Sequence, residues 1–163
     1  MSMPPTWRWF DRVGGVLLAA VMVPGVLLGA YYGWARLFPA SRWYDLSSVH
    51  VPDGVVGEIV TVVPIRTVHR PFWGSYVTTL REAQTMRAVC SGGSEVRYDP
   101  RAGLPDPVTL DWWTAGAEPP CQEALGSGEF VLTTCVRVDL IFFPDREVCA
   151  DSNLFTIRPR KDT

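Results

Sequence analysis

Residues 75–80 read SYVTTL, a stretch of β-branched and aromatic residues with a period of two. Such residues favour a pleated strand, and alternation is the pattern of a strand with one buried face. The runs VTVV at 60–63, VTL at 108–110 and FVL at 130–132 have the same character. Gly, Pro, Asp or Ser residues end these runs, as turns commonly require. The pattern predicts an all-β domain.

The expected strands cover residues 57–64, 66–70, 73–81, 85–90, 108–113, 128–139 and 146–158. Short strands with frequent turn signals are typical of an immunoglobulin-like antiparallel β-sandwich. Helical periodicity is confined to one possible turn around 119–125. Residues 91–107, SGGSEVRYDPRAGLPDP, are expected to form a long connection rich in Gly and Pro.

Before this domain, residues 13–34 read VGGVLLAAVMVPGVLLGAYYGW and carry no charge. A helix of this length would cover about 33 Å, slightly more than the hydrocarbon core of a bilayer at about 30 Å. Aromatic residues at both ends fit the two headgroup levels of a membrane span. They are Trp7 and Trp9 before the run, and Tyr31, Tyr32, Trp34, Trp43 and Tyr44 at its far end. The sequence therefore predicts one transmembrane helix.

A cleaved secretory signal is the alternative. Arg8 and Arg12 supply a basic start, and Gly33-Trp34-Ala35 is an acceptable small-x-small cleavage site. The apolar run is longer than the roughly 7–15 residues of a typical signal, which favours a retained anchor.

The orientation follows from cysteine, because the positive charges on the two sides of the run are nearly balanced. The domain beyond the run contains all the cysteines, Cys90, Cys121, Cys135 and Cys149. An even number in a small domain suggests disulfides, which persist in oxidising compartments. We therefore expect a single-pass protein of the cytoplasmic (inner) membrane with its carboxy-terminal domain in the periplasm. Four buried, reduced thiols on the cytoplasmic side are the alternative.

Four cysteines allow three connectivities. If residues 140–144 (LIFFP) form the loop of a hairpin, Cys135 and Cys149 lie directly opposite each other. That register leaves Cys90 to pair with Cys121. A tight turn at Pro144-Asp145 would instead separate Cys135 from Cys149 by more than the roughly 7 Å between Cα atoms that a disulfide tolerates.

The favoured register has a consequence for contacts with other molecules. It places Ile141, Phe142 and Phe143 at the tip of the hairpin, where an exposed apolar group would mark a partner or membrane contact. Alternatively, these residues continue the strand into the core.

The predicted membrane helix contains a stripe of small residues. Gly25, Gly29 and Gly33 recur every four residues, a spacing that lets two helices approach closely. Self-association through this stripe is an expectation that Pro24 weakens, since proline kinks helices.

The distribution of charge argues against nucleic acid as a partner. The chain has a net charge of −2, and residues 1–42 carry four Arg against one Asp. The remainder, 43–163, therefore has a net charge of −5 and would be repelled by phosphate backbones.

The sequence contains no recognisable catalytic or metal-binding motif. Its two histidines, His50 and His69, have no paired-ligand spacing, the cysteines form no CxxC pair, and GxSxG is absent. We therefore expect no catalytic residue, metal or cofactor. One ring of the Trp112-Trp113 pair is expected to face outward, and we take it to be Trp113. Together with Trp73 and Tyr76, this ring could form an aromatic platform for a glycan or peptide.

Several short motifs give the chain a family resemblance. They are RPF at 70–72, WG at 73–74, YDP at 98–100, LPDP at 104–107, LDWW at 110–113 and SNLF at 152–155. In this pattern, which covers most of 60–158, the chain resembles uncharacterised, single-pass membrane-anchored small proteins of bacteriophages and prophages. The resemblance includes cysteines at Cys90 and Cys121, whereas Cys135 and Cys149 look like an addition. It implies an envelope protein associated with a phage and no active site.

The expected organisation is a cytoplasmic tail at 1–12, the membrane helix at 13–34, a juxtamembrane linker at 35–46, a periplasmic β-sandwich at 47–159 and a tail at 160–163. The expected function is that of a non-enzymatic accessory protein that contacts membrane lipid and another envelope or phage protein. A carbohydrate- or peptidoglycan-binding module is the alternative.

Overall fold

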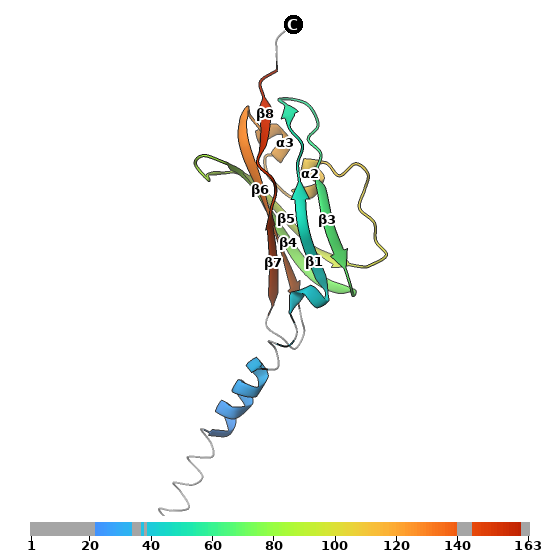
Figure 1. The fold of residues 1–163 in the computed structure, drawn as a ribbon, viewed down its shortest axis with the longest axis vertical. Coiled ribbons are helices and arrows are strands. Elements are labelled where there is room, and N and C mark those ends of the chain that lie inside the picture. Colours follow the sequence, from blue (N-terminus) through green and yellow to red (C-terminus); the bar gives the residue numbers. More distant parts are fainter. Residues whose placement is uncertain (1–21, 34–36, 38, 140–144, 161–163) are drawn as a thin grey trace, which may run out of the picture. The chain divides into compact units, whose positions relative to one another are not determined.

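The computed structural model describes residues 22–33, 37, 39–139 and 145–160. The chain divides into two units, Met1–Pro39 and Ala40–Thr163 (Figure 1).

In the first unit, residues 22–33 form a helix. Across the part of the chain that the structure describes, no helix combines the length and the hydropathy that a membrane crossing requires. Residues 13–21 and 34 of the expected span lie outside the described residues. Gly25, Gly29 and Gly33 all lie on the described helix, and no atom lies within 4 Å of the position that a Cβ would take on any of them. Self-association through these glycines stays a prediction.

The second unit consists mainly of β-strands, as the sequence predicts. Its elements are η1 (Ala40–Arg42), β1 (Tyr44–His50), β2 (Gly54–Val55), β3 (Val63–Val68), β4 (Phe72–Glu82), β5 (Ala88–Tyr98), α2 (Leu110–Trp113), α3 (Cys121–Ala124), β6 (Gly128–Asp139), β7 (Arg146–Asp151) and β8 (Phe155–Arg158).

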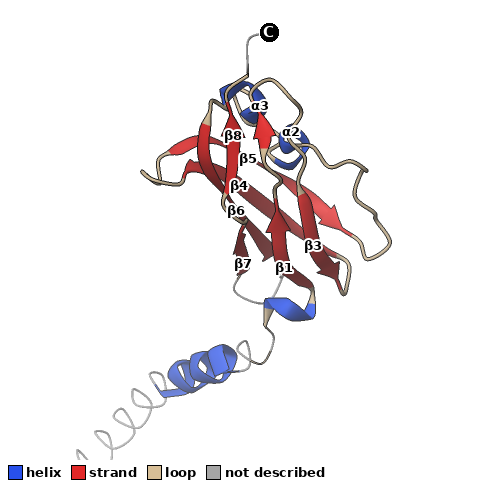
Figure 2. Cartoon of the chain, turned by 45° about the horizontal axis from the view of Figure 1, so that its top comes forward, coloured by secondary structure: helices blue, strands red, loops and turns tan. Residues whose placement is uncertain are grey.

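The strands form a large sheet and a small one (Figure 2). The large sheet has the order β2-β8-β6-β4-β5, and β7 also pairs with β6. Strand β4 is central, since it pairs antiparallel with β5 and β6 along nearly its whole length. The small sheet is the antiparallel pair of β1 and β3. Only the short pairing of β2 with β8 is parallel among the described strand pairs.

The two sheets meet in a cluster of aromatic rings. Phe72 of β4 and Tyr98 of β5 are stacked, with their ring centroids 4.5 Å apart. Tyr44 of β1 contacts Tyr98 edge-on, at 5.3 Å between centroids. All three side chains are buried, so the inner faces of the two sheets share one hydrophobic core.

The position of Tyr44 corrects the expected boundary of the domain. The sequence suggests a linker over 35–46 and an interfacial role for Tyr44. In the structure, β1 begins at Tyr44, which is only 1% exposed. The pattern does not reveal this strand because a bulge between Leu46 and Ser48 interrupts its register and breaks the period of two.

The expected strands over 73–81 and 128–139 correspond to β4 and β6, and the expected helical turn around 119–125 corresponds to α3. The expected strand over 108–113 is wrong. Residues Leu110–Trp113 form the helical turn α2, because the Thr109 side chain accepts a hydrogen bond from the backbone N–H of Trp112 and caps the helix.

The expected connection over 91–107 is also partly wrong, because β5 continues to Tyr98. Gly92 and Gly93 suggest a loop, but they lie within the strand. The lack of a side chain on Gly92 lets the backbone of 114–115 approach closely, and that on Gly93 makes room for the backbone of Tyr76. The N–H of Gly93 donates to the Ala115 carbonyl at 2.8 Å.

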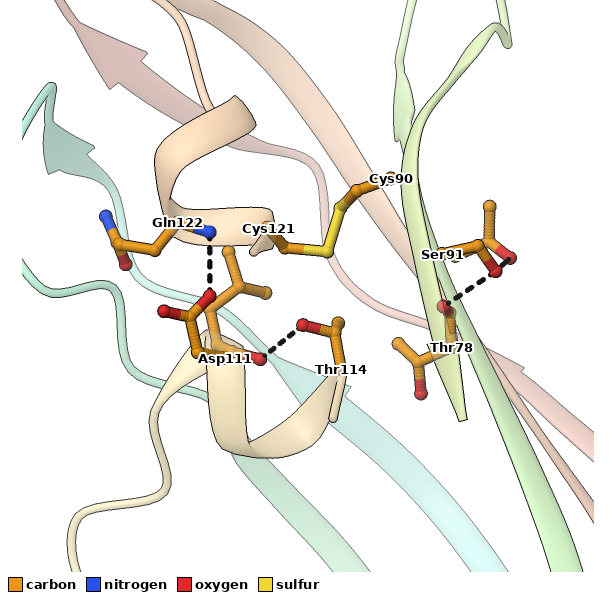
Figure 3. Close-up of a disulfide and its surroundings, with 9 residues drawn as sticks. Thr78, Cys90, Ser91, Asp111, Thr114, Cys121 and Gln122 are labelled. Atoms are coloured by element: carbon orange, nitrogen blue, oxygen red, sulfur yellow. Dashed lines mark hydrogen bonds between the residues drawn. A yellow bond between two sulfur atoms is a disulfide. The ribbon is translucent and has the colours of Figure 1, made fainter. Parts of the chain in front are cut away.

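Two disulfides join the cysteines in the favoured connectivity. Cys90 of β5 bonds to Cys121 of α3, with 5.5 Å between Cα atoms (Figure 3). Cys135 of β6 bonds to Cys149 of β7, and the two residues lie directly opposite in the antiparallel register. The loop tip expected at Ile141, Phe142 and Phe143 lies outside the described residues.

Candidate binding site

A pocket of about 190 Å³ opens on the inner side of the large sheet. It lies among strands of both sheets, the helical turn α2 and the connection that follows β5. Aromatic rings make up much of its wall, and Arg66, Arg97 and Asp99 contribute charged groups. The lining residues that bear on ligand binding are Tyr44, Arg66, Tyr76, Tyr98, Trp112 and Trp113.

Helix α2 places its two tryptophans differently. Successive residues of a helix point about 100° apart, so the turn that buries one ring turns its neighbour away from the core. Trp113 is buried, at 5% exposure, whereas Trp112 is 47% exposed. Their ring centroids are 6.2 Å apart and the ring planes are tilted by 36°. Trp112 is therefore the ring that a ligand can reach.

A buried polar chain fixes Trp113. Its indole Nε1–H donates to the hydroxyl of Thr134 on β6 at 2.9 Å. The hydroxyls of Thr134 and Thr78 are hydrogen-bonded at 3.2 Å, and both threonines are buried. Because the indole N–H has its partner inside the protein, Trp113 contributes a rigid apolar wall rather than a hydrogen bond to a ligand.

Tyr76 of β4 supplies a polar group to the pocket. A tyrosine phenol is protonated at neutral pH, and burial raises the pKa of Tyr76 further. Among the described residues, none forms a hydrogen bond with this hydroxyl. A ligand in the pocket can therefore accept a hydrogen bond from Tyr76 or donate one to it.

Trp73 does not line the pocket, which corrects the expected aromatic platform of Trp73, Tyr76 and Trp113. Residues 73 and 76 are an odd number of positions apart on one strand, so their side chains project from opposite faces. Tyr76 lines the pocket, whereas Trp73 is 63% exposed on the outer face of the sheet. The expectation that Trp113 is the outward ring is also wrong, since that ring is Trp112. The structure does bring Tyr76 and Trp113 to one pocket.

The polar residues that the sequence offers for chemistry are placed apart from the pocket. His50 and His69 are both exposed. Asp111 has a structural role, because its carboxylate accepts the backbone N–H of Gln122 at 2.8 Å and so joins α2 to α3 (Figure 3).

One group of potential metal ligands occurs within the described residues. It consists of Cys135, Glu147 and Cys149. Because the two sulfur atoms are bonded to each other, neither is a thiolate, which is the form that binds metals.

Comparison with known proteins finds no family model that matches the chain, and no curated protein or solved structure with significant similarity to it. The pocket itself is therefore the basis for assigning a function. A small, mainly aromatic cavity with a few polar groups is a typical ligand-binding arrangement. Sequence reasoning missed Tyr44, Arg66 and Tyr98, because residues from three strands meet here only after the two sheets pack.

Proposed function

We propose that this protein is a non-catalytic accessory protein of the bacterial cell envelope that binds a sugar ring in the pocket beside Trp112. The observation that carries the proposal is the half-exposed Trp112 next to the buried wall of Trp113 and the hydroxyl of Tyr76. The C–H face of a pyranose ring packs on an exposed indole, and its hydroxyls require hydrogen-bonding groups such as Tyr76.

The size of the pocket suits one ring. Pockets for drug-sized ligands hold roughly 300–1,000 Å³, so the 190 Å³ found here favours a monosaccharide unit, either free or at the end of a chain. A polymer such as peptidoglycan would present such units at the cell envelope.

We also propose that the binding domain is an immunoglobulin-like sandwich. Two mainly antiparallel sheets that pack their inner faces together support this class.

The proposal includes the membrane tether and a periplasmic domain. The uncharged run over 13–34 supports the tether, and the two disulfide-paired sets of cysteines support an oxidising compartment. The motif resemblance supports an association with a phage or prophage.

A reporter fusion tests the orientation. We expect alkaline phosphatase fused after Thr163 to be active and to sediment with membranes, because that enzyme requires an oxidising compartment. A matched fusion of a fluorescent protein that matures only in the cytoplasm should stay dark. A fluorescent fusion, or an active phosphatase that washes free of membranes, would contradict the tether.

A sedimentation assay on purified cell-wall sacculi tests the sugar site. We expect the detergent-solubilised full chain to sediment with sacculi, and Trp112→Ala to reduce retention at least about tenfold, because the stacking surface is lost. Trp73→Ala is the matched control, since it removes an even more exposed tryptophan from the opposite face.

The second candidate function is contact with another envelope or phage protein. That candidate is favoured by Trp73 and Val77, which are both exposed on β4 and form an apolar surface away from the pocket. If Trp73→Ala abolishes retention on sacculi and Trp112→Ala leaves it unchanged, the wall binds this exposed surface and the sugar site beside Trp112 is wrong.

A further inference from the structure

Arg66 gives the pocket a positive charge that the binding of a neutral sugar does not use. It lies on β3 with its side chain directed inward, half-buried, and it lines the pocket. Its guanidinium carbon lies 5.8 Å from the ring centroid of Tyr98, in cation–π range. The same guanidinium acts on Tyr44, where it opposes the rise in the pKa of the phenol that burial causes. The charge of Arg66 therefore lies beside two buried tyrosines.

No acidic side chain among the described residues neutralises Arg66. The ion pairs in that part of the chain involve Arg87, Arg137 and Arg158, and none includes Arg66. Asp99 and Arg97 also line the pocket, so its lining contains two cations against one anion, and Asp99 forms no ion pair with Arg66 in the described part of the chain.

The chemistry of arginine indicates which ligand would satisfy this site. A guanidinium presents a planar fork of N–H donors that fits a carboxylate with two parallel hydrogen bonds. Removal of such a cation from water is unfavourable unless an anion compensates it. The half-buried position beside the tyrosines therefore favours an anionic group on the ligand.

We propose that the pocket selects an acidic sugar: the ring packs on Trp112 and a carboxylate of the ligand binds Arg66. This inference rests on the proposed sugar site and adds the class of sugar. Both muramic acid of the cell wall and the uronic acids of other polysaccharides have this chemistry.

Matched pairs of monosaccharides test the selection by saturation-transfer NMR and by titration of tryptophan fluorescence with the full chain. N-acetylmuramic acid differs from N-acetylglucosamine by the lactyl group that bears the carboxylate. Glucuronic acid has a carboxylate where glucose has a hydroxymethyl group. We expect the acidic member to bind about tenfold or more tightly than the neutral member. The pair with the stronger binding identifies the source of the ligand.

Substitution of the arginine tests its role directly. We expect Arg66→Gln to abolish the preference for the acidic member of each pair, while Arg66→Lys retains part of the preference because the charge remains without the fork. Arg70→Gln is the matched control, since it removes an exposed charge just beyond β3 and outside the pocket lining. Melting temperatures of all three variants report whether the fold is intact.

The outcomes separate this inference from the proposed function. Equal affinity for both members of each pair, or a preference that survives Arg66→Gln, would overturn the selection by Arg66 and leave the sugar site standing. Absence of binding by all four sugars would overturn both.

Discussion

Replacement of Cys90 and Cys121 together by alanine should lower the free energy of unfolding by about 4 kcal/mol. The disulfide closes a sequence separation of 31 residues, for which the loop-entropy model gives about 3.7 kcal/mol at 25 °C. Burial adds to this value, because Cys121 is fully buried and its removal leaves unfilled space beside α3. Denaturant unfolding followed by circular dichroism measures the change.

The second disulfide provides the matched control. Cys135 and Cys149 are separated by 14 residues, for which the same model gives about 3 kcal/mol. These residues are already held together by the hydrogen bonds between β6 and β7, and Cys149 is exposed. The alanine pair at 135 and 149 should therefore leave the tryptophan fluorescence of the folded protein unchanged, whereas the pair at 90 and 121 should alter it.

That difference in fluorescence follows from what each bond restrains. The bond from Cys90 to Cys121 ties α3 to the large sheet, and Asp111 joins α3 to α2, which carries Trp112 and Trp113 (Figure 3). If the Cys90/Cys121 variant unfolds at the wild-type denaturant concentration, or if the two variants change the fluorescence equally, the bond does not restrain the pocket.

The sequence predicts the central strands well because their pattern follows from burial on one face. Strand β6 alternates buried and more exposed residues from Phe130 to Val138, and its run of β-branched residues has no competing interpretation. The pairing of Cys135 with Cys149 could also be predicted, because the choice of loop length determines the antiparallel register.

Elements that depend on a local cap or on a distant neighbour could not be predicted in this way. Val108, Thr109 and Leu110 favour a strand by propensity, yet the hydroxyl of Thr109 caps a helical turn. Similarly, Gly92 and Gly93 suggest a loop, yet they lie in a strand where the backbone of 114–115 packs against Gly92 and that of Tyr76 against Gly93.

The candidate site was only partly predictable for a related reason. Tyr76 and Trp113, which the sequence offers as aromatic binding residues, both line the pocket, but the choice of the outward ring between Trp112 and Trp113 depends on the rotation of a single helical turn. Arg66 belongs to the small sheet, and nothing in its local sequence indicates that it will face Tyr98 of the large sheet. Prediction of a site that forms where two sheets pack together requires knowledge of the strand register in both sheets.

Substitution of Gly92 by alanine should destabilise the domain by about 3 kcal/mol or more. A Cβ at this position would overlap the carbonyl oxygen of Thr114 and would come within 2.8 Å of the Ala115 carbonyl oxygen. Both obstacles are backbone atoms. Thr114 is buried, and its hydroxyl donates to the Leu110 carbonyl at 2.8 Å, so the segment cannot move aside without loss of its own contacts.

The same clash gives the substitution an effect on function. A displaced Thr114 would shift the end of α2 and with it Trp113, so Gly92→Ala should reduce both the unfolding free energy and the retention on sacculi. Gly126→Ala is the matched control: nothing lies within 4 Å of its Cβ position, and alanine there should leave stability unchanged or raise it by about 0.4 kcal/mol through the unfolded chain. Equal stability of the Gly92→Ala and Gly126→Ala variants would show that the backbone of 114–115 does not pack against β5. The position assigned to Trp112, which depends on that contact, would then be wrong.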